Sequence, residues 1–192
     1  MIQAVIWFLA GLTLISDIFI VLFLLMTFVR SDKSHQANCC QKFRQYLARN
    51  SLSLVFIVSF TATLGSLFFS AIAKFTPCVL CWYQRIFMYP QPFLTVLALR
   101  RKEAVIIPYL LLLNLIGLPI TLYHYLIQRL PAASIGSFCQ IGGTVSCTKN
   151  FTLYFGYITI PLMAATAFLL NIILLKLKPT KSRPGRWDIG LA

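Results

Sequence analysis

Two cysteines separated by two residues are the part of this sequence most able to do chemistry. Cys78 and Cys81 precede an apolar segment, and Arg85 follows Cys81 by four residues. Thiols at this spacing can close a small disulfide and open it again. The reacting species is the thiolate, and a nearby cation or a helix N-terminus lowers its pKa from about 8.5. Residues four apart share a helix face, so the motif predicts a redox-active pair with a cation beside Cys81.

A second pair, Cys139 and Cys147, lies in the connection of residues 127–150, which is rich in glycine and serine. A thiolate attacks a disulfide through a mixed disulfide, so electrons can pass from a substrate dithiol into one pair and then into the other. Two purely structural disulfides are the plainer alternative. The four cysteines could also form a tetrahedral zinc site. Seven residues separate the second pair, which is unlike a zinc knuckle, and no metal is expected.

The composition is that of a membrane protein. Apolar residues make up 59% of the 192 positions and charged residues 11%, whereas soluble domains carry about 25% charged residues. The formal charge of +13 comes from basic residues that are grouped between apolar runs. This grouping is typical of the cytoplasmic edge of a bilayer, so nucleic-acid binding is not expected.

Five apolar runs are long enough to cross a bilayer, which takes about 20 residues. They are residues 2–29, 52–73, 81–99, 104–126 and 151–175. The connections 30–50 and 100–103 and the tail after residue 175 hold 13 of the 17 Lys and Arg residues. The positive-inside rule then places the N-terminus outside and the C-terminus in the cytoplasm, as expected for a multi-pass protein of a cytoplasmic (inner) membrane.

This orientation sorts the cysteines by compartment. Both pairs fall outside the cytoplasm, where disulfides persist, and Cys39 and Cys40 fall inside it. The final electron acceptor must take two electrons beside Cys81 at the membrane edge, and a lipid-soluble quinone meets that need. Arg85 could hold a quinone oxygen, stabilise the Cys81 thiolate, or do both.

Two further ionisable residues lie in apolar runs. His124 stands between two tyrosines near the outer end of the fourth run. It could shuttle a proton to reduced quinone, or it could simply belong to an interfacial aromatic belt. Asp17 lies near the middle of the first run and has no evident partner in the sequence. That first run is too long for a signal peptide and lacks preceding positive residues, so it is predicted to be a retained anchor.

From about residue 50 to residue 175 the chain resembles the DsbB/BdbC family of disulfide bond formation proteins, most closely the BdbC branch. The resemblance rests on the run 77–90, PCVLCWYQRIFMYP, and on YHYLIQ at residues 123–128, which looks like the segment before the second cysteine pair. The family implies a four-helix bundle that oxidises an extracytoplasmic thioredoxin-fold thiol oxidase (DsbA-like) and passes electrons to membrane quinone. The first 50 residues depart from the family pattern.

The resemblance also implies roles for individual residues. Cys139 and Cys147 would exchange with the thiol oxidase, whereas Cys78 and Cys81 would face the quinone. Arg85 matches an arginine implicated at the quinone, and His124 is similar in position to a histidine there.

The sequence thus predicts an all-α membrane protein, a four-helix transmembrane bundle with one extra N-terminal transmembrane helix. Its parts are an extra helix and basic connection (1–50), a DsbB-like domain (51–175) and a basic cytoplasmic tail (176–192). The predicted function is that of a thiol:quinone oxidoreductase in disulfide bond formation, using ubiquinone or menaquinone. The alternatives are a non-catalytic membrane scaffold with two structural disulfides and an enzyme like vitamin K epoxide reductase.

Overall fold

The computed structural model of the chain describes residues 2–28, 37–101, 104–129 and 153–177, and most of these residues are helical. A single isolated bridge, between Tyr154 and Ile158, is the one pairing of the strand type there. The elements in order are α1 (Ile2–Phe28), α2 (Ala37–Leu67), the π-helical turn η2 (Phe68–Ile72), α3 (Val79–Met88), α4 (Pro90–Arg101), the 3₁₀ turn η3 (Ala104–Ile106), α5 (Ile107–Arg129) and α6 (Ile160–Leu177).

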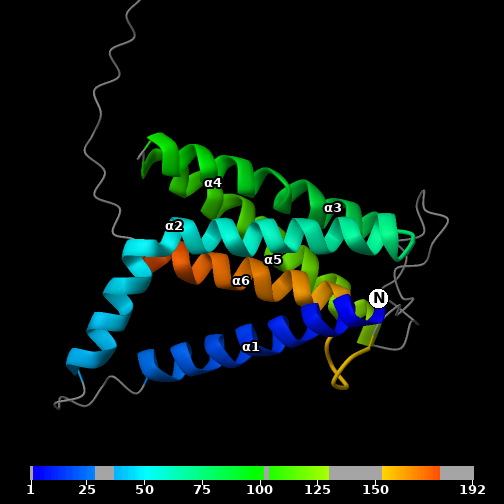
Figure 1. Cartoon of the computed structure of the whole chain (residues 1–192), viewed down its shortest axis with the longest axis horizontal. Coiled ribbons are helices and arrows are strands. Elements are labelled where there is room, and N and C mark those ends of the chain that lie inside the picture. Colours follow the sequence, from blue (N-terminus) through cyan, green and yellow to red (C-terminus); the bar gives the residue numbers. More distant parts are fainter. Residues whose placement is uncertain (1, 29–36, 102–103, 130–152, 178–192) are drawn as a thin grey trace, which may run out of the picture.

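Four of the described helices are long and apolar enough to cross a membrane on their own. They are Ile2–Met26, Lys42–Ile72, Ile107–Arg129 and Ile160–Leu177. The third predicted span, residues 81–99, consists of two shorter helices, α3 and α4, which follow each other along one line (Figure 1). The break falls at Pro90, whose ring removes the backbone N–H and suits the first position of a new helix.

The last span begins later than the sequence indicates. It was predicted over residues 151–175, but α6 begins at Ile160. Residues before it make a tight turn, with positive φ at Phe155 (51°) and Gly156 (76°), a conformation that no helix tolerates. Apolar residues in that turn prolong the hydropathy run without prolonging the helix.

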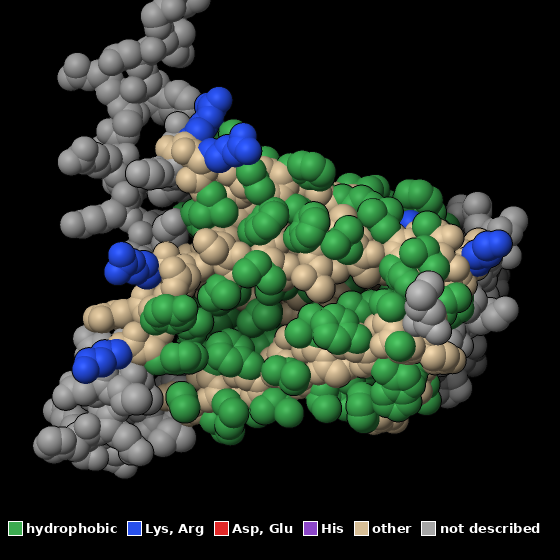
Figure 2. Space-filling view, viewed as in Figure 1, with side chains coloured by type: hydrophobic (Ala, Val, Ile, Leu, Met, Phe, Trp, Pro, Cys, Tyr) green, Lys and Arg blue, Asp and Glu red, His purple; other side chains and the backbone are tan. Residues whose placement is uncertain are grey.

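The helices form a bundle in which α6 packs against α2 and α5, and α1 lies along α6 on the outside (Figure 1). The prediction of a four-helix bundle with one extra N-terminal helix is confirmed. At one end of the bundle an apolar core joins α2, α4, α5 and α6, with Val55, Ala98, Ile107 and Leu110 fully buried. Hydrophobic side chains cover the visible flank of the molecule, and Lys and Arg gather at its ends (Figure 2). The chain is therefore a multi-pass membrane protein.

Four fully buried polar side chains, here called the amide cluster, connect α2, α4, α5 and α6 midway along the bundle. They are Ser59, Gln91, Asn114 and Asn171. Gln91 Oε1 accepts hydrogen bonds from Asn114 Nδ2 and Asn171 Nδ2, each 3.0 Å long, and Asn171 Nδ2 also donates to Ser59 Oγ at 3.0 Å. Polar side chains that bond across apolar helices fix the rotation and depth of each helix. The cluster therefore sets the register on which the site depends.

Candidate functional site

The two cysteines of the C-x-x-C motif stand where the chain enters α3. Cys78 is the N-cap residue, in an extended conformation, and the helix starts at Val79. Both thiols are free, and their sulfurs lie 3.1 Å apart. A disulfide bond is about 2.05 Å long, so a small movement of the side chains brings the sulfurs to bonding distance when an oxidant accepts two electrons from the pair. A helix N-terminus also favours the negative charge of a thiolate.

Cys78 faces α5, where it meets His124. Both side chains are almost fully buried, with 5% and 1% of their surface exposed. The Cys78 sulfur lies 3.6 Å from His124 Nε2, and the amide of Gln84 lies 2.9 Å from Nδ1 of the same ring. When Gln84 Nε2 donates to Nδ1, the neutral imidazole carries its proton on Nε2, where it faces the sulfur. Cys78, Cys81, Gln84 and His124 are called the redox cluster below.

The surroundings of Cys78 favour its ionised form. The hydrogen bond with Cys81 lowers the pKa of the Cys78 thiol, and His124 lowers it further through a hydrogen bond and through charge, while burial acts in the opposite direction. The net effect brings the pKa to about 4. The reduced pair therefore holds a thiolate at neutral pH.

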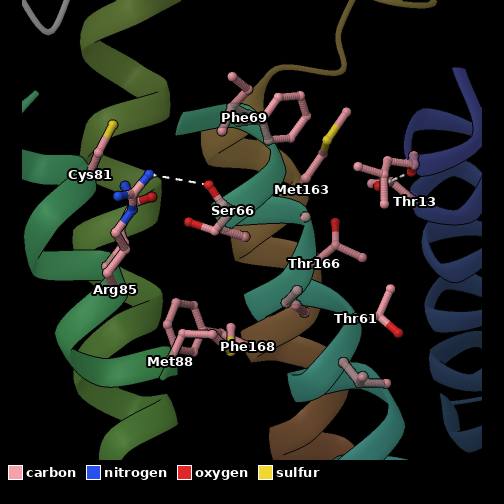
Figure 3. A pocket seen from close by; sticks show the side chains of 18 of the residues that line it. Thr13, Thr61, Ser66, Phe69, Cys81, Arg85, Met88, Met163, Thr166 and Phe168 are labelled. Atoms are coloured by element: carbon pink, nitrogen blue, oxygen red, sulfur yellow. Dashed lines mark hydrogen bonds between the residues drawn. The ribbon is translucent and has the colours of Figure 1, made fainter. Parts of the chain in front are cut away.

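Cys81 faces the other way, onto a cavity of about 250 Å³ whose lining is mostly apolar. Figure 3 shows Cys81 and Arg85 on one side of this cavity, on α3, with α2 and α6 beyond them and α1 on the far side. Phe168 and Met88 line its inner end. One thiol of the pair thus contacts the histidine, and the other lines a mostly apolar cavity.

Arg85 is held at this cavity by α2. Its guanidinium donates a 3.2 Å hydrogen bond to the backbone carbonyl of Ser66 and lies 5.2 Å from the centre of the Trp82 ring. This carbonyl lies two residues before the point where α2 gives way to the π-helical turn η2, which begins at Phe68. The hydroxyl of Ser70 donates to the same carbonyl at 3.2 Å. The C-terminal end of α2 thus binds the arginine against the cavity wall.

The structure brings four of the six predicted site residues together and places each of them. Cys81 and Arg85 line the cavity, and Cys78 and His124 contact each other behind it. Cys139 and Cys147 lie outside the described residues, as do the side chains of Cys39 and Cys40, so predictions about them stay predictions.

Sequence reasoning missed Gln84, which bonds His124 and also lines the cavity. A polar amide between Cys81 and Arg85, in a segment predicted to cross the membrane, was the available signal.

The redox cluster also contains a possible metal-binding set. The sulfurs of Cys78 and Cys81 and a ring nitrogen of His124 all lie within 4.8 Å of one another. Two thiolates and one imidazole are ligands that suit zinc. This set differs from the four-cysteine site weighed from the sequence, because a histidine of α5 takes part.

Residues 48–177 match the family model described as "Disulfide bond formation protein DsbB". The "SPbeta prophage-derived disulfide bond formation protein B" of Bacillus subtilis (strain 168) is 48% identical over 117 residues, which cover 61% of this chain and 77% of that protein. The "Probable disulfide formation protein C" of Bacillus cereus (strain ATCC 14579) is 50% identical over 112 residues, covering 58% of this chain and 78% of the relative.

The "Disulfide bond formation protein C" of B. subtilis is 44% identical over 117 residues, covering 61% of this chain and 83% of the relative. No solved structure matches the chain. The match to the family model spans well over half of the sequence, and the helices and cysteine pair that it covers are those that build the site. The chain belongs to the DsbB family of disulfide bond formation proteins.

Proposed function

We propose that this protein is a thiol:quinone oxidoreductase that reoxidises an extracytoplasmic thioredoxin-fold thiol oxidase. The observation that carries the proposal is the position of Cys81, whose thiol lines an apolar cavity that also holds the Arg85 guanidinium. In a chain of the DsbB family, a redox dithiol that opens onto such a cavity is suited to transfer electrons to an apolar acceptor.

The cavity fits the head of a quinone in size and in chemistry. An engineered cavity of about 150 Å³ binds benzene, and this one, at about 250 Å³, accommodates a substituted ring. Its walls are mainly apolar with a few polar groups, as in most small-molecule sites. Arg85 supplies N–H donors for a quinone oxygen. A bound quinone supplies an acceptor for two electrons and two protons, which balances the closing of the Cys78–Cys81 disulfide.

The residues around the pair prepare it for this oxidation. The pKa of Cys78 is lowered, so one of the two protons has already left the reduced pair at neutral pH. His124 lies against the Cys78 sulfur and is oriented by Gln84. In this arrangement His124 acts on the Cys78 thiol and does not line the cavity.

The second cysteine pair is proposed to reduce the first by thiol–disulfide exchange. Cys139 and Cys147 belong to the connection that leaves α5 near Cys78, since Ile127 of α5 packs against Cys78. The two flanks of this connection are joined by Arg129, which donates a 2.7 Å hydrogen bond to the carbonyl of Gly156. The exchange would leave an oxidised pair for the partner protein and a reduced Cys78–Cys81 pair for the quinone.

The distribution of charge supports the proposed orientation in a bacterial cytoplasmic membrane. The basic residues at the start of α2, the end of α4 and the end of α6 all lie at the end of the bundle opposite Cys78 (Figures 1 and 2). The positive-inside rule places that end in the cytoplasm and the thiols outside it.

The test is quinone reduction by the purified full chain, with a decyl-chain quinone and a reduced thioredoxin-fold partner, followed by absorbance. We expect turnover in the parent and none in Cys81→Ser or Cys139→Ser. Cys139→Ser should still pass electrons from dithiothreitol, which can reduce the first pair directly.

Cys40→Ser is the matched control and should keep the parent rate. No turnover with either a ubiquinone or a menaquinone analogue, together with disulfides that survive millimolar glutathione, would overturn the proposal in favour of a scaffold braced by structural disulfides.

A further inference from the structure

The N-terminal helix α1 lies outside the part of the chain that matches the family model, yet it forms one wall of the cavity. Residues Leu9, Leu12, Thr13 and Ser16 of α1 line the same space as Cys81. Figure 2 shows the surface hollowed between α2 and α1, and Figure 3 shows Thr13 of α1 facing the cavity from the side opposite Arg85. Without α1, this side of the cavity would open to lipid.

A partly buried hydrogen bond fixes α1 in this position. Thr166 of α6 donates to Asp17 Oδ1 at 2.7 Å, and the Tyr157 hydroxyl lies 3.5 Å from Oδ2. A carboxyl group in a membrane helix is unfavourable unless it finds polar partners, so Asp17 specifies both the depth and the rotation of α1. Ile6, Ala10 and Ile20, which are almost fully buried, lie on the same helical stripe and face the bundle.

The wall that α1 presents is apolar in effect, even though two of its residues carry hydroxyl groups. Thr13 Oγ1 donates to the carbonyl of Leu9, and Ser16 Oγ donates to that of Leu12, each at 2.9 Å. Both hydroxyls are therefore hydrogen-bonded within their own helix. Leu9 packs directly over Gly65 of α2, where an added Cβ would meet Leu9 Cδ1 at 3.4 Å. The α1 wall therefore offers hydrocarbon contacts and no free donor aimed at a ligand.

The opposite wall has the reverse character, because Cys81, Gln84 and Arg85 all come from α3. The cavity is thus polar at α3 and apolar at α1. The four lining residues of α1 cover about 10 Å along the helix axis, at about 1.5 Å per residue. A ligand with a polar ring and a hydrocarbon tail matches this polarity in only one orientation, with the ring at α3 and the tail at α1.

We propose that α1 is the tail-binding wall of the quinone cavity, that Leu9 and Leu12 contact the first part of the hydrocarbon tail, and that Asp17 positions them through Thr166. This inference rests on the proposed function and deepens it, since it assigns the tail specificity of the site to a helix outside the family match. Asp17 acts as a positioning residue and Leu9 and Leu12 as contact residues.

The first test compares two quinones with the same ring, one with a decyl tail and one with no tail, in dithiol-driven reduction by the full chain. The double variant Leu9→Ala/Leu12→Ala should raise KM for the decyl quinone by about tenfold, because apolar contacts in a pocket are lost. KM for the tailless quinone and kcat for both should stay as in the parent. Phe8→Ala/Ile15→Ala is the matched control, because both side chains are 66% exposed on the outer face of α1.

The positioning role of Asp17 is tested in the same assay. Asp17→Leu should raise KM for the decyl quinone alone, whereas Asp17→Asn, which can still accept from Thr166, should restore the parent value. Equal changes for the two quinones, or no change in either, would overturn the inference while leaving the proposed function intact. A parent that reduces neither quinone would overturn both proposals together.

A second readout does not depend on turnover. A decyl quinone with a photoreactive group at the tail end should label α1 in the intact parent protein, as judged by mass spectrometry of the peptides. Labelling confined to α3 and α5 would overturn the assignment even if the kinetic differences were seen.

Discussion

The amide cluster and the redox cluster are both buried groups of polar side chains in the same bundle, but they are built differently. In the amide cluster the side chains bond to one another across four helices. In the redox cluster, Cys78 has a sulfur and an imidazole as neighbours, and its partner Cys81 lies on a cavity. An apolar layer that contains Met88 and Phe168 lies between them along the helices.

The difference shows how one fold separates stability from reactivity. Amide groups do not ionise near neutral pH and take no part in thiol–disulfide exchange. A network of them therefore serves to hold helices together. In the thiol pair, the pKa of Cys78 is lowered, so the reduced pair carries a thiolate, and the two sulfurs can form or break a disulfide bond. Changes in the amide cluster should therefore alter stability, and changes in the redox cluster should alter chemistry.

The largest expected effect on activity is that of Cys81→Ser. The serine hydroxyl cannot form the disulfide, so turnover should fall to the background rate in both dithiol- and partner-driven assays. The melting temperature should stay within about 2 °C of the parent, because the substitution is nearly isosteric and Cys81 takes no part in the amide cluster. A large fall in melting temperature would mean that the two clusters are not separate in function.

Gln91→Leu should lower stability and leave activity nearly unchanged, the opposite of Cys81→Ser. It removes the oxygen that accepts from Asn114 and Asn171, and it leaves two buried donors without this partner. We expect a loss of about 2–3 kcal/mol of unfolding free energy, measured by denaturation in mixed micelles. At a temperature where the variant is folded, kcat should change by less than about twofold. Phe93→Ala, at a position of α4 that is 77% exposed, is the control and should leave stability nearly unchanged.

His124→Phe should change the pH dependence of the reduced pair. His124 helps to lower the pKa of Cys78, although the hydrogen bond with Cys81 contributes more. The thiolate is present above its pKa and is lost as the pH falls through it, so in the parent it should persist well below pH 7. In the variant the titration should move to higher pH, with part of the lowering retained. Ultraviolet absorbance of the thiolate measures this, and an unchanged titration would contradict the assigned role of His124.

Much of the fold could be predicted from the sequence, because apolar runs indicate the membrane-spanning helices and basic residues indicate the connections between them. The closeness of Cys78, Cys81 and Arg85 could be predicted, because these residues are near one another in the chain. The site could not be predicted where contacts join distant segments. Asp17 had no partner in the sequence because Thr166 reaches it across helices. His124 was assigned to the quinone by resemblance, whereas its contact with Cys78 depends on how α3 packs on α5.

Gly117→Ala should have the smallest effect on activity among these variants of the two clusters and their boundary, and it tests the apolar layer between the clusters. A Cβ at Gly117 would lie 2.4 Å from Phe168 Cε1, so the ring must move. Phe168 lines the cavity, and we expect KM for a decyl quinone to rise a few-fold while unfolding free energy falls by about 1–3 kcal/mol. Gly11→Ala is the matched control. No atom lies within 4 Å of a Cβ there, and an alanine in a helix should stabilise the protein by about 0.5–1 kcal/mol with KM unchanged. If Gly117→Ala lowered stability but left KM alone, Phe168 would belong to the packing of the amide cluster and not to the wall of the cavity.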